Sequence, residues 1–215
     1  MPSYNTDELK KRFIVIEGID GAGTTTQMKF LAEYLRARGY RCATTSEPTE
    51  GSIGILIRSI LSGERRVAPS TVAYLFASDR NEHLFGSDGI VEQVESGSIV
   101  ISDRYALSSL AYQGLTCGEE LPLRLNGTFP APGLTLLFDI APEVAIERIN
   151  SRPKKEIYET LEFQKRVCEM YRKMANRLQS QGWNIERIEA NADIETVHHE
   201  ILSKVVSFLG ASATR

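Results

Sequence analysis

The sequence predicts an α/β fold in which helices cover both faces of a five-stranded parallel sheet. Two observations support this prediction: short apolar runs alternate along the chain with segments whose apolar residues recur at helical spacing. The apolar runs are nearly continuous, as is typical of strands buried on both faces of a parallel sheet. No internal repeat or linker interrupts the alternation, so residues 1–215 are expected to form a single domain.

The first expected strand is the run FIVIE, which a glycine-rich turn follows at once. Four further runs of similar character are separated from one another by helical segments. In chain order, the expected strands are Phe13–Glu17, Arg41–Thr45, Ser98–Ser102, Leu134–Ile140 and Trp183–Ile188.

The first long helix is expected over Thr25–Arg38, where Met28, Leu31 and Leu35 recur at helical spacing and Gly39 marks the stop. The stretch from Gly114 to Gly133 is rich in Gly and Pro and is expected to be loop with some helix. The remaining expected helices are Ile53–Leu61, Thr71–Phe85, Ile90–Glu95, Tyr105–Tyr112, Pro142–Ile149, Thr160–Gln181 and Ile194–Leu209.

Composition limits the range of functions. The net charge of −3 argues against a general nucleic-acid-binding protein, which would need a basic surplus. Cys42, Cys117 and Cys168 are widely spaced and odd in number, so free thiols in a reducing cytoplasm are expected rather than disulfides or a zinc site. The N-terminal segment is polar and no run approaches 18 apolar residues, so neither a signal peptide nor a membrane span is expected.

The turn after the first strand resembles a phosphate-binding loop. Residues 18–25, GIDGAGTT, stand between a predicted strand and a predicted helix, the context that the GxxxxGK[ST] pattern requires. Backbone N–H groups of such a turn and the N-terminus of the following helix favour phosphate oxygens. Thr25 stands where a hydroxyl would bind magnesium, but Thr24 occupies the lysine position. The loop alone leaves open a purely structural glycine-rich turn.

Five segments in order resemble the thymidylate kinase family, from about residue 12 to residue 171: FIVIEGIDGAGTTTQ, SEPTEGSIGILIRSIL, YLFASDRNEH, VISDRYALSSLAYQG and EIYETLEFQKRV. The resemblance implies a P-loop kinase fold with a helical lid at about residues 148–160, and usually a homodimer. It also implies transfer of the γ-phosphoryl group of ATP to dTMP, giving dTDP, with Mg²⁺ as the cofactor. ATP and dTMP are therefore the expected ligands, and neither nucleic acid nor a membrane is an expected partner.

The resemblance assigns roles to residues that contact phosphates and metal. Asp103 and Thr25 correspond to magnesium ligands, and Arg104, Asp20 and Arg152 correspond, with Asp103, to catalytic residues. A salt bridge at a strand end is the structural alternative for the Asp103–Arg104 pair. The expected ATP-binding residues are Gly18, Ile19, Asp20, Gly21, Ala22, Gly23, Thr24, Thr25, Thr26 and Arg148.

The resemblance also assigns the acceptor site. Phe76 and Arg80 lie four residues apart on one predicted helix face and correspond to residues that stack on and hydrogen-bond to thymine. For Leu61, ordinary core packing is an equally good interpretation. The complete expected set is Glu47, Arg58, Leu61, Phe76, Arg80, Arg104, Ser109, Gln113 and Tyr158.

The sequence departs from the family pattern at Thr24, and also at Ser46, where many relatives carry arginine. One hypothesis is that the lid cations Arg152, Lys154 and Lys155 partly supply the charge of the missing lysine. Two alternatives stay open: a nucleotide-binding pseudo-kinase with lost turnover, and a kinase for another nucleoside monophosphate such as dUMP.

Overall fold

The computed structural model describes residues 4–150, 158 and 160–213. Its sheet has five strands in the order β2-β3-β1-β4-β5, and every neighbouring pair is parallel. All five predicted strands are confirmed, with ends shifted by no more than two residues. Their bounds are β1 Phe13–Glu17, β2 Cys42–Ser46, β3 Ile99–Asp103, β4 Leu134–Asp139 and β5 Ile185–Glu189.

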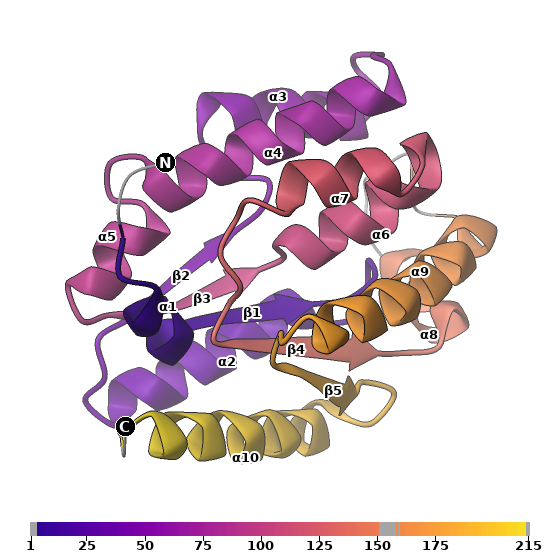
Figure 1. Ribbon diagram of the computed structural model, residues 1–215. Coiled ribbons are helices and arrows are strands. Elements are labelled where there is room, and N and C mark those ends of the chain that lie inside the picture. The colour runs from indigo at the N-terminus through magenta and orange to yellow at the C-terminus, as the bar shows by residue number, and fades with distance from the viewer. Residues whose placement is uncertain (1–3, 151–157, 159, 214–215) are drawn as a thin grey trace.

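Helices cover both faces of this sheet, as predicted (Figure 1). The helices α2 (Thr24–Ala37) and α10 (Ile194–Ala213) pack together along one face. On the other face lie α4 (Pro69–Phe85), α6 (Ala106–Cys117) and α9 (Leu161–Ser180), with α6 and α9 in extensive contact. Every residue of β1 and β3 is buried, because these central strands have helices on both sides.

The remaining helices are short: α1 Thr6–Arg12, α3 Ser52–Leu61, α5 Ile90–Glu95, α7 Glu120–Asn126 and α8 Pro142–Asn150. The helix α1 was not predicted, because Leu9 is its one buried residue and its sequence shows no apolar residues at helical spacing. A capping side chain begins it: Asn5 accepts hydrogen bonds from the N–H groups of Asp7 and Glu8. The helix α6 runs five residues beyond its predicted end at Tyr112, to Cys117.

Parallel pairing brings the carboxyl ends of three strands to one edge of the sheet. Asp103 at the end of β3 is in register with Ile16 of β1 on one side and with Ser46 of β2 on the other. The chain order reverses at β1, which lies between β3 and β4, and such a switch point is where open parallel sheets bind ligands. Among the described residues, no helix combines the length and apolar character that crossing a membrane requires.

Candidate functional site

The loop between β1 and α2 is shaped to receive an anion. Gly23 adopts a left-handed backbone conformation at φ 92° and precedes the first residue of α2, so the helix N-terminus opens directly from the loop. Gly21, at φ 83°, lies so close to α8 that a Cβ there would stand 2.3 Å from the carbonyl oxygen of Ala145. The glycines of this turn are therefore required both by backbone conformation and by the packing of α8.

Thr24, at the position of the missing lysine, is the first residue of α2 and lines the same cleft. Only 7% of its surface is exposed, and its methyl group lies near Gly18, where a Cβ would approach it to 3.3 Å. The side chain therefore contributes a short neutral group at the phosphate end of the cleft, where lysine would contribute a charge.

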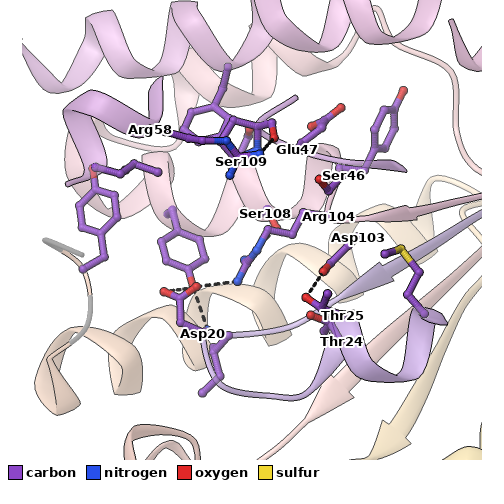
Figure 2. Close-up of a pocket in the computed structure, with 18 of the residues that line it drawn as sticks. Asp20, Thr24, Thr25, Ser46, Glu47, Arg58, Asp103, Arg104, Ser108 and Ser109 are labelled. Atoms are coloured by element: carbon purple, nitrogen blue, oxygen red, sulfur yellow. Dashed lines mark hydrogen bonds and ion pairs between the residues drawn. The ribbon is translucent and has the colours of Figure 1, made fainter. Parts of the chain in front are cut away.

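Thr25 and Asp103, the two residues predicted to bind a metal, lie in contact at the carboxyl edge of the sheet. The Thr25 hydroxyl donates to Asp103 Oδ2 at 2.5 Å (Figure 2). Asp103 is buried, and its second oxygen, Oδ1, has no hydrogen-bond partner among the described residues. A carboxylate oxygen left without a partner next to a hydroxyl is a donor set that suits Mg²⁺.

Asp20 and Arg104 form an ion pair across the cleft, with 2.6 Å between Arg104 Nη2 and Asp20 Oδ1 (Figure 2). The other oxygen of Asp20 accepts hydrogen bonds from the Tyr112 hydroxyl at 3.0 Å and from Gln164 Nε2 at 2.9 Å. Burial, followed by the nearby Asp20 charge, raises the pKa of Tyr112, which keeps its hydroxyl protonated as a donor. Asp20 is thus held by groups from the turn after β3, from α6 and from α9.

Glu17, the last residue of β1, lies fully buried directly before the loop. Its carboxylate accepts hydrogen bonds from Tyr105, Ser108 and Tyr171, and the last two side chains also contact Arg104. Burial raises the pKa of Glu17 to about 7, although the bond from Ser108 and the charge of Arg104 act in the opposite direction.

The far end of the cleft is built around Arg80, whose side chain is 1% exposed. Its guanidinium donates to Glu47 at 2.5 Å and to Ser109 at 3.1 Å, and also to Asn126. Burial opposes ionisation of Glu47, but Arg80 and His83 hold its pKa below the usual value. A buried pair of this kind fixes the geometry of both partners, because breaking it would leave one charge uncompensated.

Two residues that line the same cleft each carry a buried polar atom without a partner. Arg80 Nε and Gln113 Oε1 are buried and have no hydrogen-bond partner within the described part of the chain. A cleft lined by an arginine and a glutamine together with Phe76 and Leu61 suits a flat, partly polar ring such as a nucleobase.

Arg58 lies at the mouth of the cleft, where it contacts Glu50 at 3.1 Å and the carbonyl of Pro48. Each arginine that lines the cleft therefore has a carboxylate partner in the described structure. The three pairs are Arg58–Glu50, Arg80–Glu47 and Arg104–Asp20.

These groups surround one cleft of about 380 Å³. The predicted site residues that line it are Ile19, Asp20, Gly21, Gly23, Thr24, Thr25, Thr26, Glu47, Arg58, Leu61, Phe76, Arg80, Asp103, Arg104, Ser109, Gln113 and Tyr158. Six lining residues were not predicted as site residues: Met28, Ser46, Pro48, Tyr105, Ser108 and Tyr112. Of these, Tyr105, Ser108 and Tyr112 belong to the VISDRYALSSLAYQG segment, and Ser108 and Tyr112 lie four residues apart on α6, each directly before a predicted site residue.

Three predicted ATP-binding residues, Gly18, Ala22 and Arg148, are not part of the cleft lining. Gly18 and Ala22 belong to the loop backbone, and Arg148 Nη1 on α8 lies 3.5 Å from the Ala22 carbonyl oxygen. Tyr158 lines the cleft and stacks on Phe163, with ring centroids 4.8 Å apart. Arg152 and most of the expected lid lie outside the described residues.

Comparison with known proteins gives one consistent result. The family model described as thymidylate kinase matches residues 16–201. Among curated relatives named as thymidylate kinases, one from Treponema pallidum (strain Nichols) is 39% identical over 88% of this chain and 92% of its own length. One from Thermococcus kodakarensis is 39% identical over 92% of this chain and 98% of its own. One from Thermococcus gammatolerans is 41% identical over 90% and 95% respectively.

Proposed function

The chain belongs to the thymidylate kinase family, and from this premise we propose that its cleft transfers the γ-phosphoryl group of ATP to dTMP, giving dTDP. The observation that carries the proposal is the convergence of a phosphate loop, the Thr25–Asp103 pair and the Asp20–Arg104 pair at one edge of the sheet. Phosphoryl transfer depends mainly on positioning and charge neutralisation, and these groups can provide both.

The donor phosphates would lie on the N–H groups of residues 18–26 and the N-terminus of α2. Arg104 would bridge the transferred group and the acceptor phosphate, because a planar guanidinium can bind oxygens of both. No general base is needed, because the attacking oxygen of the dTMP phosphate is already anionic at neutral pH. Arg148, which contacts the loop at Ala22, would support the donor nucleotide.

The acceptor would lie along the rest of the cleft. Thymine would stack on Phe76 beside Leu61 and hydrogen-bond to Arg80, Ser109 and Gln113. The unpaired Arg80 Nε and Gln113 Oε1 support this placement.

The sugar and phosphate of dTMP would meet a second group of residues. Asp20 would accept a hydrogen bond from the sugar 3′-hydroxyl, and Tyr158 would cover the sugar. Arg58 would bind the phosphate, with Glu47 in the adjoining loop.

Mg²⁺ would be held by the Thr25 hydroxyl and Asp103, directly or through water, where it would neutralise charge on the phosphates. The unpartnered Asp103 Oδ1 supports this assignment. Thr24 carries no charge. The lid cations, with Arg152 as the catalytic one, would therefore partly supply the positive charge that a lysine at this position provides in the family.

We further propose a cytoplasmic homodimer. All three cysteines are free, in keeping with a reducing compartment. Ile55 of α3 and Tyr74 of α4 are 58% and 51% exposed on neighbouring helices, which supports an apolar contact with a second copy. Sedimentation equilibrium of the wild-type chain and of an Ile55→Glu, Tyr74→Glu variant tests the assembly, and a monomeric wild type would contradict it.

The activity is tested by coupled ADP release with ATP and each of dTMP, dUMP, dGMP and dCMP. dTMP should be turned over fastest, and Arg104→Ala should lower turnover by about a hundredfold or more. Arg38→Ala, which removes an arginine stacked on Tyr34 outside the cleft, is the matched control. Nucleotide binding without ADP release would contradict the proposal, and a preference for dUMP would change the assigned acceptor.

A further inference from the structure

The buried carboxylate of Glu17 has no direct part in the proposed reaction, yet both of its oxygens are fully used. Oε1 accepts from the backbone N–H groups of Tyr105 at 3.0 Å and Ser108 at 3.1 Å. Oε2 accepts from the Ser108 hydroxyl at 2.5 Å, and it shares the Tyr171 hydroxyl, 3.2 Å away, with the Gly18 carbonyl oxygen, which lies 3.1 Å from that hydroxyl. One side chain of β1 thereby joins the start of α6 to the middle of α9.

Glu17 also fixes the backbone that carries Arg104. The N-cap residue of α6, Tyr105, makes no side-chain capping bond, and Glu17 takes over this function from the neighbouring strand. Immediately before the cap, Arg104 adopts a left-handed φ of 75°, which is uncommon for a residue with a side chain. Its N–H donates to the Ile16 carbonyl at 2.8 Å, so two adjacent residues at the end of β1 hold this turn.

The two hydroxyls bound to Glu17 are also the groups that contact the Arg104 side chain. Arg104 Nη1 lies 3.3 Å from both Ser108 Oγ and Tyr171 Oη, and these two oxygens are 2.7 Å apart. In its ionised form, which predominates above about pH 7, the Glu17 carboxylate can only accept hydrogen bonds, so it draws the Ser108 hydrogen toward itself. The lone pairs of the hydroxyl oxygens are then free to face the guanidinium.

We propose that Glu17 is a positioning residue for phosphoryl transfer: through Ser108 and Tyr171 it holds the Arg104 guanidinium in place on the side opposite Asp20. This inference rests on the role of Arg104 in the proposed function. The competing interpretation is that Glu17 only caps α6, in which case its loss would affect folding and leave transfer by the folded protein unchanged.

Two variants separate these interpretations. In Glu17→Gln the amide oxygen can still accept from both N–H groups, so the cap is kept, while the amide nitrogen donates to the hydroxyls and reverses their direction. In Tyr171→Phe one hydroxyl contact to Arg104 is removed and Glu17 is left in place. Each should lower kcat by about ten- to a hundredfold, with KM for dTMP changed by less than about threefold. Tyr34→Phe, which removes a hydroxyl outside the cleft, is the matched control and should leave kcat unchanged.

The decisive comparison repeats both variants in an Arg104→Ala background. If Glu17 and Tyr171 act through Arg104, each should lower kcat there by less than about twofold. The same fold-loss in both backgrounds, or no loss in the wild-type background, would overturn the proposal.

A readout that does not depend on turnover keeps the two proposals separate. The guanidinium NMR signals of Arg104, assigned by their loss in Arg104→Lys, should show restricted rotation in the wild-type chain and faster rotation in Glu17→Gln and Tyr171→Phe. If the wild-type chain released no ADP, the proposed function would fail, and these signals would still decide the positioning role. Unchanged rotation in both variants would refute it.

Discussion

Removing the charge of Glu17 should change how the free energy of unfolding depends on pH. Burial raises the pKa of this carboxyl from 4.5 to about 7. Between those two values the native state binds more protons than the unfolded state, so this group lowers stability as pH rises. Its stabilising contribution is complete below pH 4.5 and is lost as pH rises through about 7.

The size of the effect follows from the pKa difference. Each pH unit between the two values corresponds to about 1.4 kcal/mol, so the whole interval amounts to roughly 3 kcal/mol. Glu17 is 0% exposed, so solvent screening does not reduce this figure. Glu17→Gln cannot titrate, and the free energy of unfolding of the wild type should therefore fall relative to this variant by roughly 3 kcal/mol between about pH 4.5 and pH 8.

Urea unfolding at several pH values, followed by circular dichroism, measures this difference directly. Both proteins share every other titrating group, so the difference between their unfolding free energies isolates residue 17. Glu64→Gln, which removes an exposed carboxylate, is the control and should follow the wild type. A wild-type-minus-Gln difference that stays constant within about 0.5 kcal/mol across this range would refute the reasoning.

Three further predictions concern the charges of the phosphate site. Thr24→Lys should raise kcat/KM by less than about threefold if lid cations already supply the charge, whereas a rise of about thirtyfold or more in the ADP-release assay would indicate a deficient site. Replacing Arg152, Lys154 and Lys155 together by alanine should lower turnover by about tenfold or more, and unchanged turnover would eliminate compensation by these residues. Asp103→Asn should raise the Mg²⁺ concentration needed for half-maximal rate by about tenfold, as measured by metal titration; an unshifted titration would exclude Asp103 from the metal site.

The central architecture could be predicted because local sequence determines it. The run FIVIE is apolar at its first four positions, and the structure buries every residue of that strand between helices. The helix α1 could not be found in the same way, because a side-chain cap and one buried leucine leave no apolar period.

In the site, too, features set by local spacing could be predicted and long-range contacts could not. Phe76 and Arg80 could be placed on one helix face from their spacing, and both line the cleft. The partners of Asp20 could not be derived. Gln164, for example, is separated from it by 144 residues in the sequence, and no local sequence pattern indicates such a contact. Glu17 appeared in the sequence only as the last residue of an apolar strand, and its bonds to α6 and α9 depend on how those helices pack.

The pairing of every cleft arginine with a carboxylate has a consequence for selectivity among cellular anions. In the proposed binding mode, an incoming phosphate would compete with Glu50 or Asp20 for a guanidinium that already has an ion-pair partner. A small anion such as sulfate replaces one such contact and gains little, because one ion pair is exchanged for another. A nucleotide also brings a base and a sugar into the same cleft. The contacts of these two groups would offset the free energy lost when its phosphate displaces a carboxylate. The carboxylates would thus compete with any bound anion and favour ligands able to bind at several points at once.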